Sequence, residues 1–233
     1  MADQNENIEG EEQESLTQSI QEENKSVENY TQPDHEFLNW DGEFRYPGML
    51  SLKVSADGSC YFHAIAKAYF KPYILGKHDG KPFNRTLFIR TLRNNLARLL
   101  GSKIKGDPKG RTYWETLSRG EFVRISKDSP EFSLENMQRE LANPHPVSDI
   151  YNEFISDQLN IDIYILDAER KDVYMNGADM KLLYKDRPSV VLLYLPGHYE
   201  LIGVTYNDYV TTYFSPNDPF IKYIRERMRE LSK

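Results

Sequence analysis

The chain has 233 residues, of which 39% are hydrophobic, and this length is enough to bury a core. Its formal net charge is −7. Its one cysteine excludes an intrachain disulfide and a multi-cysteine zinc site, and its histidines show no metal-ligand spacing. The first residues lack a basic and then apolar leader, and no apolar run reaches the roughly 18–20 residues that span a bilayer. We therefore expect a soluble protein that binds no metal or other cofactor, in the cytoplasm, or in the host cytosol if the source is viral or an intracellular bacterium.

The negative charge is concentrated at the N-terminus. Residues 1–36 contain eleven acidic residues and one lysine, a net charge of −10, with hardly any large apolar side chains. Such a segment cannot bury enough surface to offset the entropy lost on ordering, so it is predicted to be a disordered acidic tail. The remaining 25 acidic and 28 basic residues are nearly balanced. A single folded domain over 37–233 is expected, without a nucleic-acid or membrane partner.

The cysteine stands where a helix is expected to begin. Cys60 follows Asp57-Gly58-Ser59 and precedes an apolar segment at 61–70. The first N–H groups of a helix have no intrahelical partner, and the helix dipole adds positive charge there, so this position favours a thiolate. Most lone cysteines, however, are small buried side chains, and apolar burial favours the neutral thiol. Position alone leaves both interpretations open.

The residues around Cys60 have expected roles of their own. Ser59 is the predicted N-cap of the helix, which leaves Asp57 free to shape the preceding loop. Gly58 supplies backbone freedom for a tight approach. His63 shares a helix face with Cys60, but the positive helix end disfavours a protonated imidazole there, so His63 is expected to be structural or substrate-facing.

Helices dominate the middle of the chain and strands the later part. A polar loop is expected at 70–83 and a solvated basic loop at 103–111. Apolar periodicity and capping residues predict helices at 84–100, 113–125, 133–142 and 148–159. The pattern then changes to strands, with a last amphipathic helix at 218–231 that starts with a proline at its first turn. The expected strands are 161–166, 172–174, 181–184, 189–195, 199–205 and 209–214.

One histidine lies at a strand start beside a turn. Pro196-Gly197 ends the apolar run at 189–195, and His198 begins the next strand. Side chains alternate along a strand, so His198 and Glu200 are expected on one face and Tyr199 on the other. A carboxylate there can fix the imidazole tautomer and direct the other ring nitrogen at a thiol. Without Cys60, a turn histidine with no function is the preferred interpretation. The histidines at 35, 78 and 145 lack this strand-edge context.

The two motifs together resemble those of the ovarian-tumour (OTU) family of cysteine proteases. The resemblance covers about 46–204 and rests on Asp-Gly-Ser-Cys before Tyr-Phe-His-Ala-Ile, and on Gly-His-Tyr-Glu far downstream. It implies a papain-like α/β (α+β) fold: a central sheet between helical regions, a cysteine at an early helix N-terminus and a histidine on a late strand. It also implies a deubiquitinase that acts, as a monomer, on ubiquitin or a ubiquitin-like protein attached to substrates.

Site residues follow from the resemblance by position. Cys60 is the implied nucleophile and His198 the general base, while Asp57 shapes an oxyanion loop that contains Gly58 and Ser59. Gly197 and Tyr199 are expected to contact substrate.

Glu200 departs from the Asp or Asn that family members often carry. Three outcomes are open: Glu200 orients His198, another polar group does, or the enzyme works as a Cys–His dyad. Two other functions also remain open, namely a papain-like protease on ordinary polypeptides and a catalytically weak ubiquitin-binding module.

Overall fold

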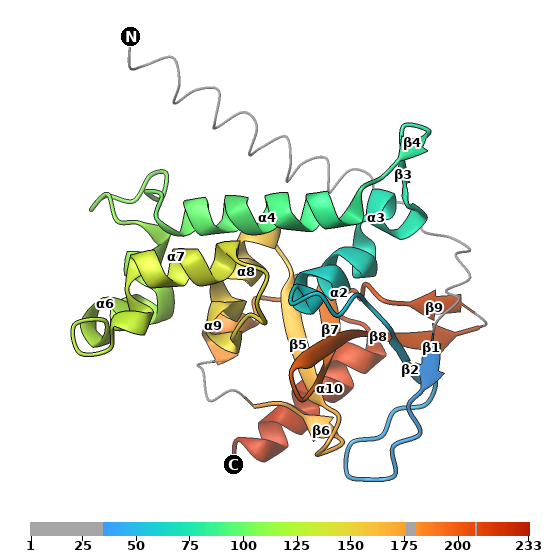
Figure 1. The fold of residues 1–233 in the computed structure, drawn as a ribbon. Coiled ribbons are helices and arrows are strands. Elements are labelled where there is room, and N and C mark those ends of the chain that lie inside the picture. Colours follow the sequence, from blue (N-terminus) through green and yellow to red (C-terminus); the bar gives the residue numbers. More distant parts are fainter. Residues whose placement is uncertain (1–34, 176–179, 208) are drawn as a thin grey trace.

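The computed structural model describes residues 35–175, 180–207 and 209–233. Within these residues, seven strands form one mixed sheet in the order β1-β2-β8-β7-β5-β6, with β9 paired to β8 (Figure 1). Only the β5–β7 pair is parallel among these pairings. The sheet strands are β1 (His35–Phe37), β2 (Met49–Leu52), β5 (Asp162–Asp167), β6 (Asp172–Val173), β7 (Ser189–Leu195), β8 (His198–Tyr206) and β9 (Tyr209–Thr211), and the separate pair is β3 (Lys77–His78) with β4 (Lys81–Pro82).

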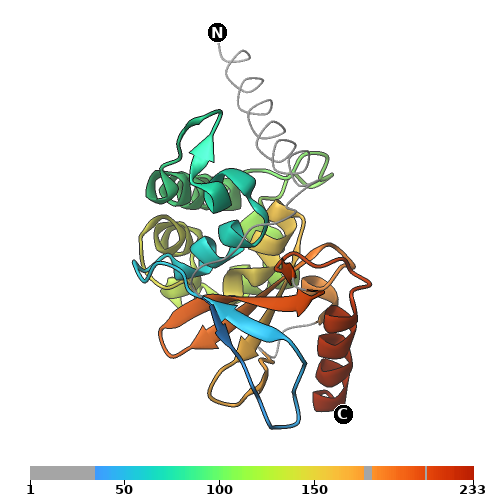
Figure 2. The same cartoon turned by 90° about the vertical axis from the view of Figure 1, so that its right-hand side faces the viewer.

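Helices cover both faces of the sheet, which confirms the predicted α/β class. Helix α2 lies against one face, with α4, α7 and α8 on the same side, whereas α10 lies on the other face (Figures 1 and 2). The α-helices are α2 (Cys60–Tyr69), α3 (Lys71–Leu75), α4 (Arg85–Leu100), α5 (Tyr113–Thr116), α6 (Glu121–Ile125), α7 (Leu134–Ala142), α8 (Asn152–Leu159), α9 (Met180–Leu183) and α10 (Pro219–Leu231), and the 3₁₀ turns are η2 (Leu117–Gly120), η3 (Pro130–Phe132) and η4 (Asp149–Tyr151).

The alternation of strand side chains divides the core into two clusters. Leu192 and Leu201 pack with α2, whereas Val191 and Ile202 pack with the apolar face of α10. Strand β7 is buried on both faces, which explains its continuous apolar sequence, because a central strand covered on both sides has no polar face to present. No helix in the described part of the chain is long and apolar enough to cross a membrane.

The local sequence signals predicted most of these elements. Asn84, Ser133 and Asp218 cap α4, α7 and α10 through their side chains. Three expectations were wrong in detail. The region 181–184 is part of a short helix, α9, and not a strand; the expected helix over 113–125 is divided into α5, η2 and α6; and the expected loop at 70–83 contains α3 and the β3–β4 hairpin.

The predicted acidic tail lies almost entirely outside the described residues. Its last two residues, His35 and Glu36, are described and belong to β1. Strand β1 pairs with β2, which continues the sheet beyond the strands expected from the sequence.

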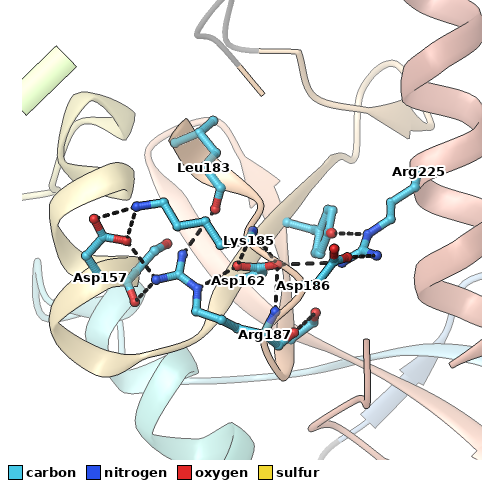
Figure 3. Close-up of polar contacts among 10 residues, drawn as sticks. Asp157, Asp162, Leu183, Lys185, Asp186, Arg187 and Arg225 are labelled. Atoms are coloured by element: carbon cyan, nitrogen blue, oxygen red, sulfur yellow. Dashed lines mark hydrogen bonds and ion pairs between the residues drawn. The ribbon is translucent and has the colours of Figure 1, made fainter. Parts of the chain in front are cut away.

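A buried carboxylate joins three segments of the fold (Figure 3). Asp162, at the start of β5, has no exposed surface and accepts hydrogen bonds from Arg187 Nε (2.8 Å) and from the backbone N–H of Lys185 (3.1 Å). Arg225 Nη2 of α10 lies 3.5 Å from Asp162 Oδ2, and Arg225 Nε donates to Tyr164 Oη (2.6 Å). This network attaches α10 and the segment before β7 to the sheet.

Replacing Asp162 by alanine is expected to lower the free energy of unfolding by about 3–5 kcal/mol, because it leaves arginine charges buried without their partner. Asp186 provides a matched control, since it binds the same Arg225 but its side chain is 84% exposed. Asp186→Asn, which keeps a residue that tolerates the left-handed backbone at this position (φ +57°), is expected to cost less than about 1 kcal/mol. Urea unfolding, followed by tryptophan fluorescence, measures both effects. Equal small effects would contradict this account of the network.

Candidate active site

Cys60 occupies the first position of α2, as the sequence predicted. The helix is buried almost throughout its length, and Cys60 itself is only 2% exposed. The segment that leads into it, residues 57–60, is called here the cysteine loop. Its conformation decides where the thiol and the first free N–H groups of α2 point, so its contacts define the candidate site.

Asp57 holds the cysteine loop by contacts on both sides. Its Oδ1 accepts the backbone N–H of Ser59 (3.0 Å), and its Oδ2 lies 2.9 Å from His63 Nε2. His63 Nδ1 lies 2.6 Å from Tyr73 Oη, so both ring nitrogens of this buried histidine are engaged. Burial raises the pKa of Tyr73 to about 12, so its hydroxyl stays protonated at neutral pH. The contacts of His63 are structural ones.

The carboxylate of Asp57 is stabilised in its ionised form. Burial raises its pKa, but hydrogen bonds from His63 and from the Ser59 N–H outweigh burial, and the net pKa lies below the ordinary value. A carboxyl whose pKa is lowered by folding stabilises the native state fully above its unfolded-state pKa of about 4. That contribution is lost as the pH falls through the lower pKa of the folded state.

We therefore expect Asp57→Asn to destabilise the protein most above pH ~5, with the difference from wild type shrinking as the pH falls below ~4. Urea unfolding at a series of pH values measures this difference. Asp79→Asn is the control, because Asp79 is 86% exposed, and its effect is expected to be small at every pH. A difference for Asp57→Asn that does not change with pH would contradict the assignment.

Ser59 is the N-cap residue by position, but its side chain makes no capping bond. Its Oγ accepts a hydrogen bond from Arg93 Nη1 (3.1 Å) instead, and the same nitrogen donates to the carbonyl of Gly58 (3.2 Å). The predicted capping contact was therefore wrong, because a side chain from α4 binds the serine oxygen.

Arg93 is the residue of this region that the sequence analysis missed. It is only 1% exposed, and its guanidinium lies 4.9 Å from the ring centroid of Phe62. A signal was present: Arg93 falls between Ile89 and Leu96 on the buried stripe of α4, where a charged residue requires partners.

Gly58 is packed against the loop that follows α7. It has a φ of +80°, and a Cβ on it would overlap the carbonyl group of Pro144. Glycine is therefore required at position 58, because the backbone is left-handed there and no room exists for a side chain. The cysteine loop and the segment at 143–145 form one close-packed unit, and His145, an exposed residue, lies beside the loop.

The contacts above determine which N–H groups remain available for a ligand. The N–H of Ser59 is taken by Asp57. In the described structure, no hydrogen bond uses the N–H of Gly58 or of Cys60. Two donors near a thiol can stabilise a negatively charged oxygen, which is the arrangement that acyl transfer requires.

Strand β8 places its first residues near the cysteine loop. The rings of Tyr61 and Tyr199 meet edge to face with centroids 5.4 Å apart, so the residues just before them, Cys60 and His198, lie at the same end of the helix–strand contact. Burial raises the pKa of Tyr199, and the charge of Asp149 acts in the same direction. Tyr199, like Leu201, is a β8 side chain on the α2 side of the sheet.

His198 begins β8 and is partly exposed, as predicted. The alternation along β8 places Tyr199 toward α2 and Glu200 on the opposite face, where Glu200 Oε2 accepts a hydrogen bond from Ser51 Oγ of β2. Among the described residues, no hydrogen bond joins the ring of His198 to Cys60 or to Glu200. The roles assigned to His198 and Glu200 therefore stay predictions.

Gly197 lies in the two-residue turn that connects β7 to β8. Leu195 pairs with His198, and Gly197 has a φ of +74°, so Pro196-Gly197 forms a turn that requires glycine at its second position. The space where a Cβ would be is open. Among the described residues, no group of three or more His, Cys, Asp or Glu side chains is arranged to hold a metal ion.

Comparisons with known proteins give structural similarity only. No protein-family model matches the chain, and no curated protein matches its sequence. A solved OTU domain in complex with ubiquitin is similar over 79% of this chain and 85% of its own, with 18% identity and a TM-score of 0.46.

Two further solved structures carry the same family name. The OTU domain of OTUD1 is similar over 66% of this chain and 85% of its own, with 14% identity and a TM-score of 0.40. An OTU deubiquitinase from Wolbachia pipientis is similar over 78% of this chain and 98% of its own, with 12% identity and a TM-score of 0.38. These structures bear the family name that the sequence motifs predicted. The case for an activity rests on the residues of the site.

Proposed function

We propose that this protein is a cysteine-type deubiquitinase, which hydrolyses the bond after the C-terminal glycine of ubiquitin or a ubiquitin-like modifier. The observation that carries the proposal is the environment of Cys60. The only cysteine of the chain begins a buried helix, behind a braced loop that leaves the N–H groups of Gly58 and Cys60 available, and at the end of α2 where β8 begins with His198.

The proposed reaction is acyl transfer through a thioester. His198 takes the proton of Cys60, and the thiolate attacks the carbonyl carbon of the terminal glycine. The negative charge that develops on the carbonyl oxygen is stabilised by the two N–H groups of the cysteine loop, each worth about 10²–10³ in rate in comparable sites. His198 then protonates the departing lysine amine. Water then hydrolyses the thioester, which releases ubiquitin with a free C-terminal carboxylate and regenerates the thiol of Cys60.

Two glycines support the proposed substrate class. The flexible tail of ubiquitin ends in Gly-Gly, which needs a narrow passage between backbone segments. Gly58 and Gly197 both have positive φ values and carry no side chain, and the space beside Gly197 is open. Tyr199 is 8% exposed and packs on the buried ring of Tyr61, so the two rings support the cysteine loop from below and offer the tail little surface. We propose that the tail passes between the cysteine loop and the β7–β8 turn.

The test compares an isopeptide-linked di-ubiquitin with a short fluorogenic peptide that ends in Leu-Arg-Gly-Gly. We expect cleavage of the ubiquitin substrate with a much higher kcat/KM than cleavage of the peptide. Equal cleavage of both would instead identify a papain-like protease on ordinary polypeptides. A folded protein that cleaves neither, and also fails with ubiquitin-like substrates, would refute the enzyme proposal.

A second candidate is a catalytically weak ubiquitin-binding module. It is favoured by two observations on Glu200: its Oε2 accepts a hydrogen bond from Ser51 Oγ, and no hydrogen bond among the described residues joins it to His198. The two candidates differ in turnover and not in binding. A protein that binds ubiquitin in a sedimentation or titration experiment, but forms no covalent adduct with ubiquitin bearing a C-terminal electrophile, would support the module.

A further inference from the structure

Arg93 stands out among the buried charges because nearly all of its donors converge on main-chain oxygens near Cys60. Besides Gly58 and Ser59, it donates to carbonyls at and after the end of α7. Nε binds the carbonyl of Leu141 (2.8 Å), and Nη2 binds those of Glu140 (3.0 Å), His145 (3.1 Å) and Asn143. A guanidinium presents its donors in a fixed planar fork, so these contacts define the position of each acceptor.

The contacts connect the cysteine loop to a second segment. The carbonyls of Glu140 and Leu141 belong to the last turn of α7, where a positive charge satisfies unpaired carbonyls and interacts favourably with the helix dipole. Asn143 and His145 flank Pro144, whose carbonyl occupies the space beside Gly58. Arg93 therefore holds both sides of the close contact that fixes the backbone of the cysteine loop.

The guanidinium of Arg93 also lies close to Cys60 in the chain's geometry, because it binds Ser59, the residue directly before the cysteine, and the carbonyl of Gly58. Burial lowers the pKa of Arg93, while the carboxylates of Asp57 and Glu140 act in the opposite direction. An arginine stays protonated in proteins, so a positive charge is always present beside the cysteine loop. The phenyl ring of Phe62 covers the guanidinium, which excludes water from it.

From this geometry we propose that Arg93 is a positioning residue for Cys60. Its guanidinium fixes the cysteine loop so that the thiol and the free N–H groups of Gly58 and Cys60 keep the arrangement needed for attack, and its charge balances the thiolate. This inference rests on the proposed function only where it concerns reaction with ubiquitin. The positioning of a reactive thiol is a separate property that can be measured without ubiquitin.

The experiment uses the full chain, in which Cys60 is the only thiol, so alkylation by iodoacetamide reports on Cys60 alone. The rate of alkylation is measured at a series of pH values for the wild type, Arg93→Lys and Arg187→Lys. For the same three proteins, the rate of reaction with ubiquitin carrying a C-terminal electrophile is measured separately. Arg187 is the matched control, because it is a mostly buried arginine that binds Asp162 and main-chain carbonyls in the network near β5. The charged or titratable groups around the cysteine loop that contribute to the profile are Asp57, His63, Arg93, Glu140, His145, Asp149, His198 and Tyr199.

We expect Arg93→Lys to slow both reactions by about 10-fold to 10²-fold and to move the pH profile of alkylation to higher pH, because lysine keeps the charge but its three N–H donors cannot reach the six oxygens that the guanidinium binds. Arg187→Lys is expected to lower the melting temperature without changing either rate. In Arg93→Ala, added methylguanidinium is expected to restore part of the alkylation rate. If Arg93→Lys fails to fold, Ser59→Ala removes one guanidinium acceptor and is expected to change the rate in the same direction.

The outcomes separate the two proposals. A folded Arg93→Lys or Ser59→Ala protein with the wild-type rate and pH profile would overturn the positioning role, and so would a wild-type Cys60 that is not alkylated in the folded protein. A wild type that is alkylated with the expected Arg93 dependence, but ignores ubiquitin and ubiquitin-like probes, would support the role of Arg93 while refuting the deubiquitinase.

Discussion

Replacing Cys60 by alanine is expected to abolish the covalent adduct with ubiquitin carrying a C-terminal electrophile and to reduce isopeptide cleavage by on the order of 10⁶-fold, as removal of a nucleophile does in comparable hydrolases. No other cysteine is present to replace it. The fold is expected to survive, because alanine is the best helix former and Cys60 lies at the helix end, where only a small side chain is removed. Mass spectrometry of the adduct and a gel assay of di-ubiquitin cleavage measure the effect.

The same variant distinguishes catalysis from binding. Cys60→Ala should still bind ubiquitin with nearly the wild-type affinity, since the change removes one buried sulfur and leaves the surface intact. Cleavage by Cys60→Ala at more than about a thousandth of the wild-type rate would show that another group is the nucleophile, because oxyanion donors and binding alone leave only a small residual rate. A Cys60→Ala protein that still performs the biological role would favour the binding module.

The parts of the site encoded by adjacent residues could be read from the sequence. The Asp-Gly-Ser turn, the start of α2 at Cys60 and the start of β8 at His198 each depend on a few neighbouring residues, and the structure has them where the sequence placed them. The resemblance to OTU proteases joined two motifs about 140 residues apart, which local patterns alone could not have paired.

The parts that depend on distant contacts could not be predicted. Strand β2 exists because it pairs with β8, about 150 residues later, and its four residues carry no strong strand signal of their own. Ser59 Oγ accepts a hydrogen bond from Arg93 of α4 and makes no capping bond to its own helix. Glu200 accepts a hydrogen bond from Ser51 of β2. For Ser59 and Glu200, the hydrogen-bond partner comes from a distant part of the chain, whereas the sequence indicated only a neighbouring one.

Arg93 shows how sequence patterns can indicate such contacts. The apolar stripe of α4 includes position 93, so a charged residue there is either a break in the pattern or a buried group with several partners. The structure shows the second case. The identity of those partners, which are oxygens of the cysteine loop, of the last turn of α7 and of the segment after it, depends on the packing of α4 against α7 and was beyond any local rule.

The second large effect is expected at His198. As the general base and acid, it should contribute about 10²–10⁴ in kcat, so His198→Ala is expected to lose that much activity on di-ubiquitin. Its pH–rate profile should also lose the limb caused by deprotonation of the base. Stopped assays of cleavage at a series of pH values measure both effects, and a thermal melt confirms that the variant is folded.

His145 is the decisive control, because it is an exposed histidine that the fold brings beside the cysteine loop. His63 is a weaker rival, since Asp57 and Tyr73 occupy both of its ring nitrogens. If His198 is the base, His145→Ala should retain the wild-type rate and pH profile. The reverse result would transfer the role to His145 and remove the reason for pairing Cys60 with β8.

The orienting group can be identified in the same series. In the structure Glu200 Oε2 accepts a hydrogen bond from Ser51 Oγ, so Oε1 is the oxygen that can accept an imidazole N–H. If Glu200 is the third catalytic residue, Glu200→Ala should lower kcat by a factor smaller than that of His198→Ala, and Ser51→Ala, which frees the carboxylate, should not lower it. If Glu200→Ala leaves kcat unchanged while His198→Ala is inactive, the site works as a Cys–His dyad. The role of Glu200 is then its hydrogen bond with Ser51 of β2, which its side chain, one methylene longer than aspartate, can reach.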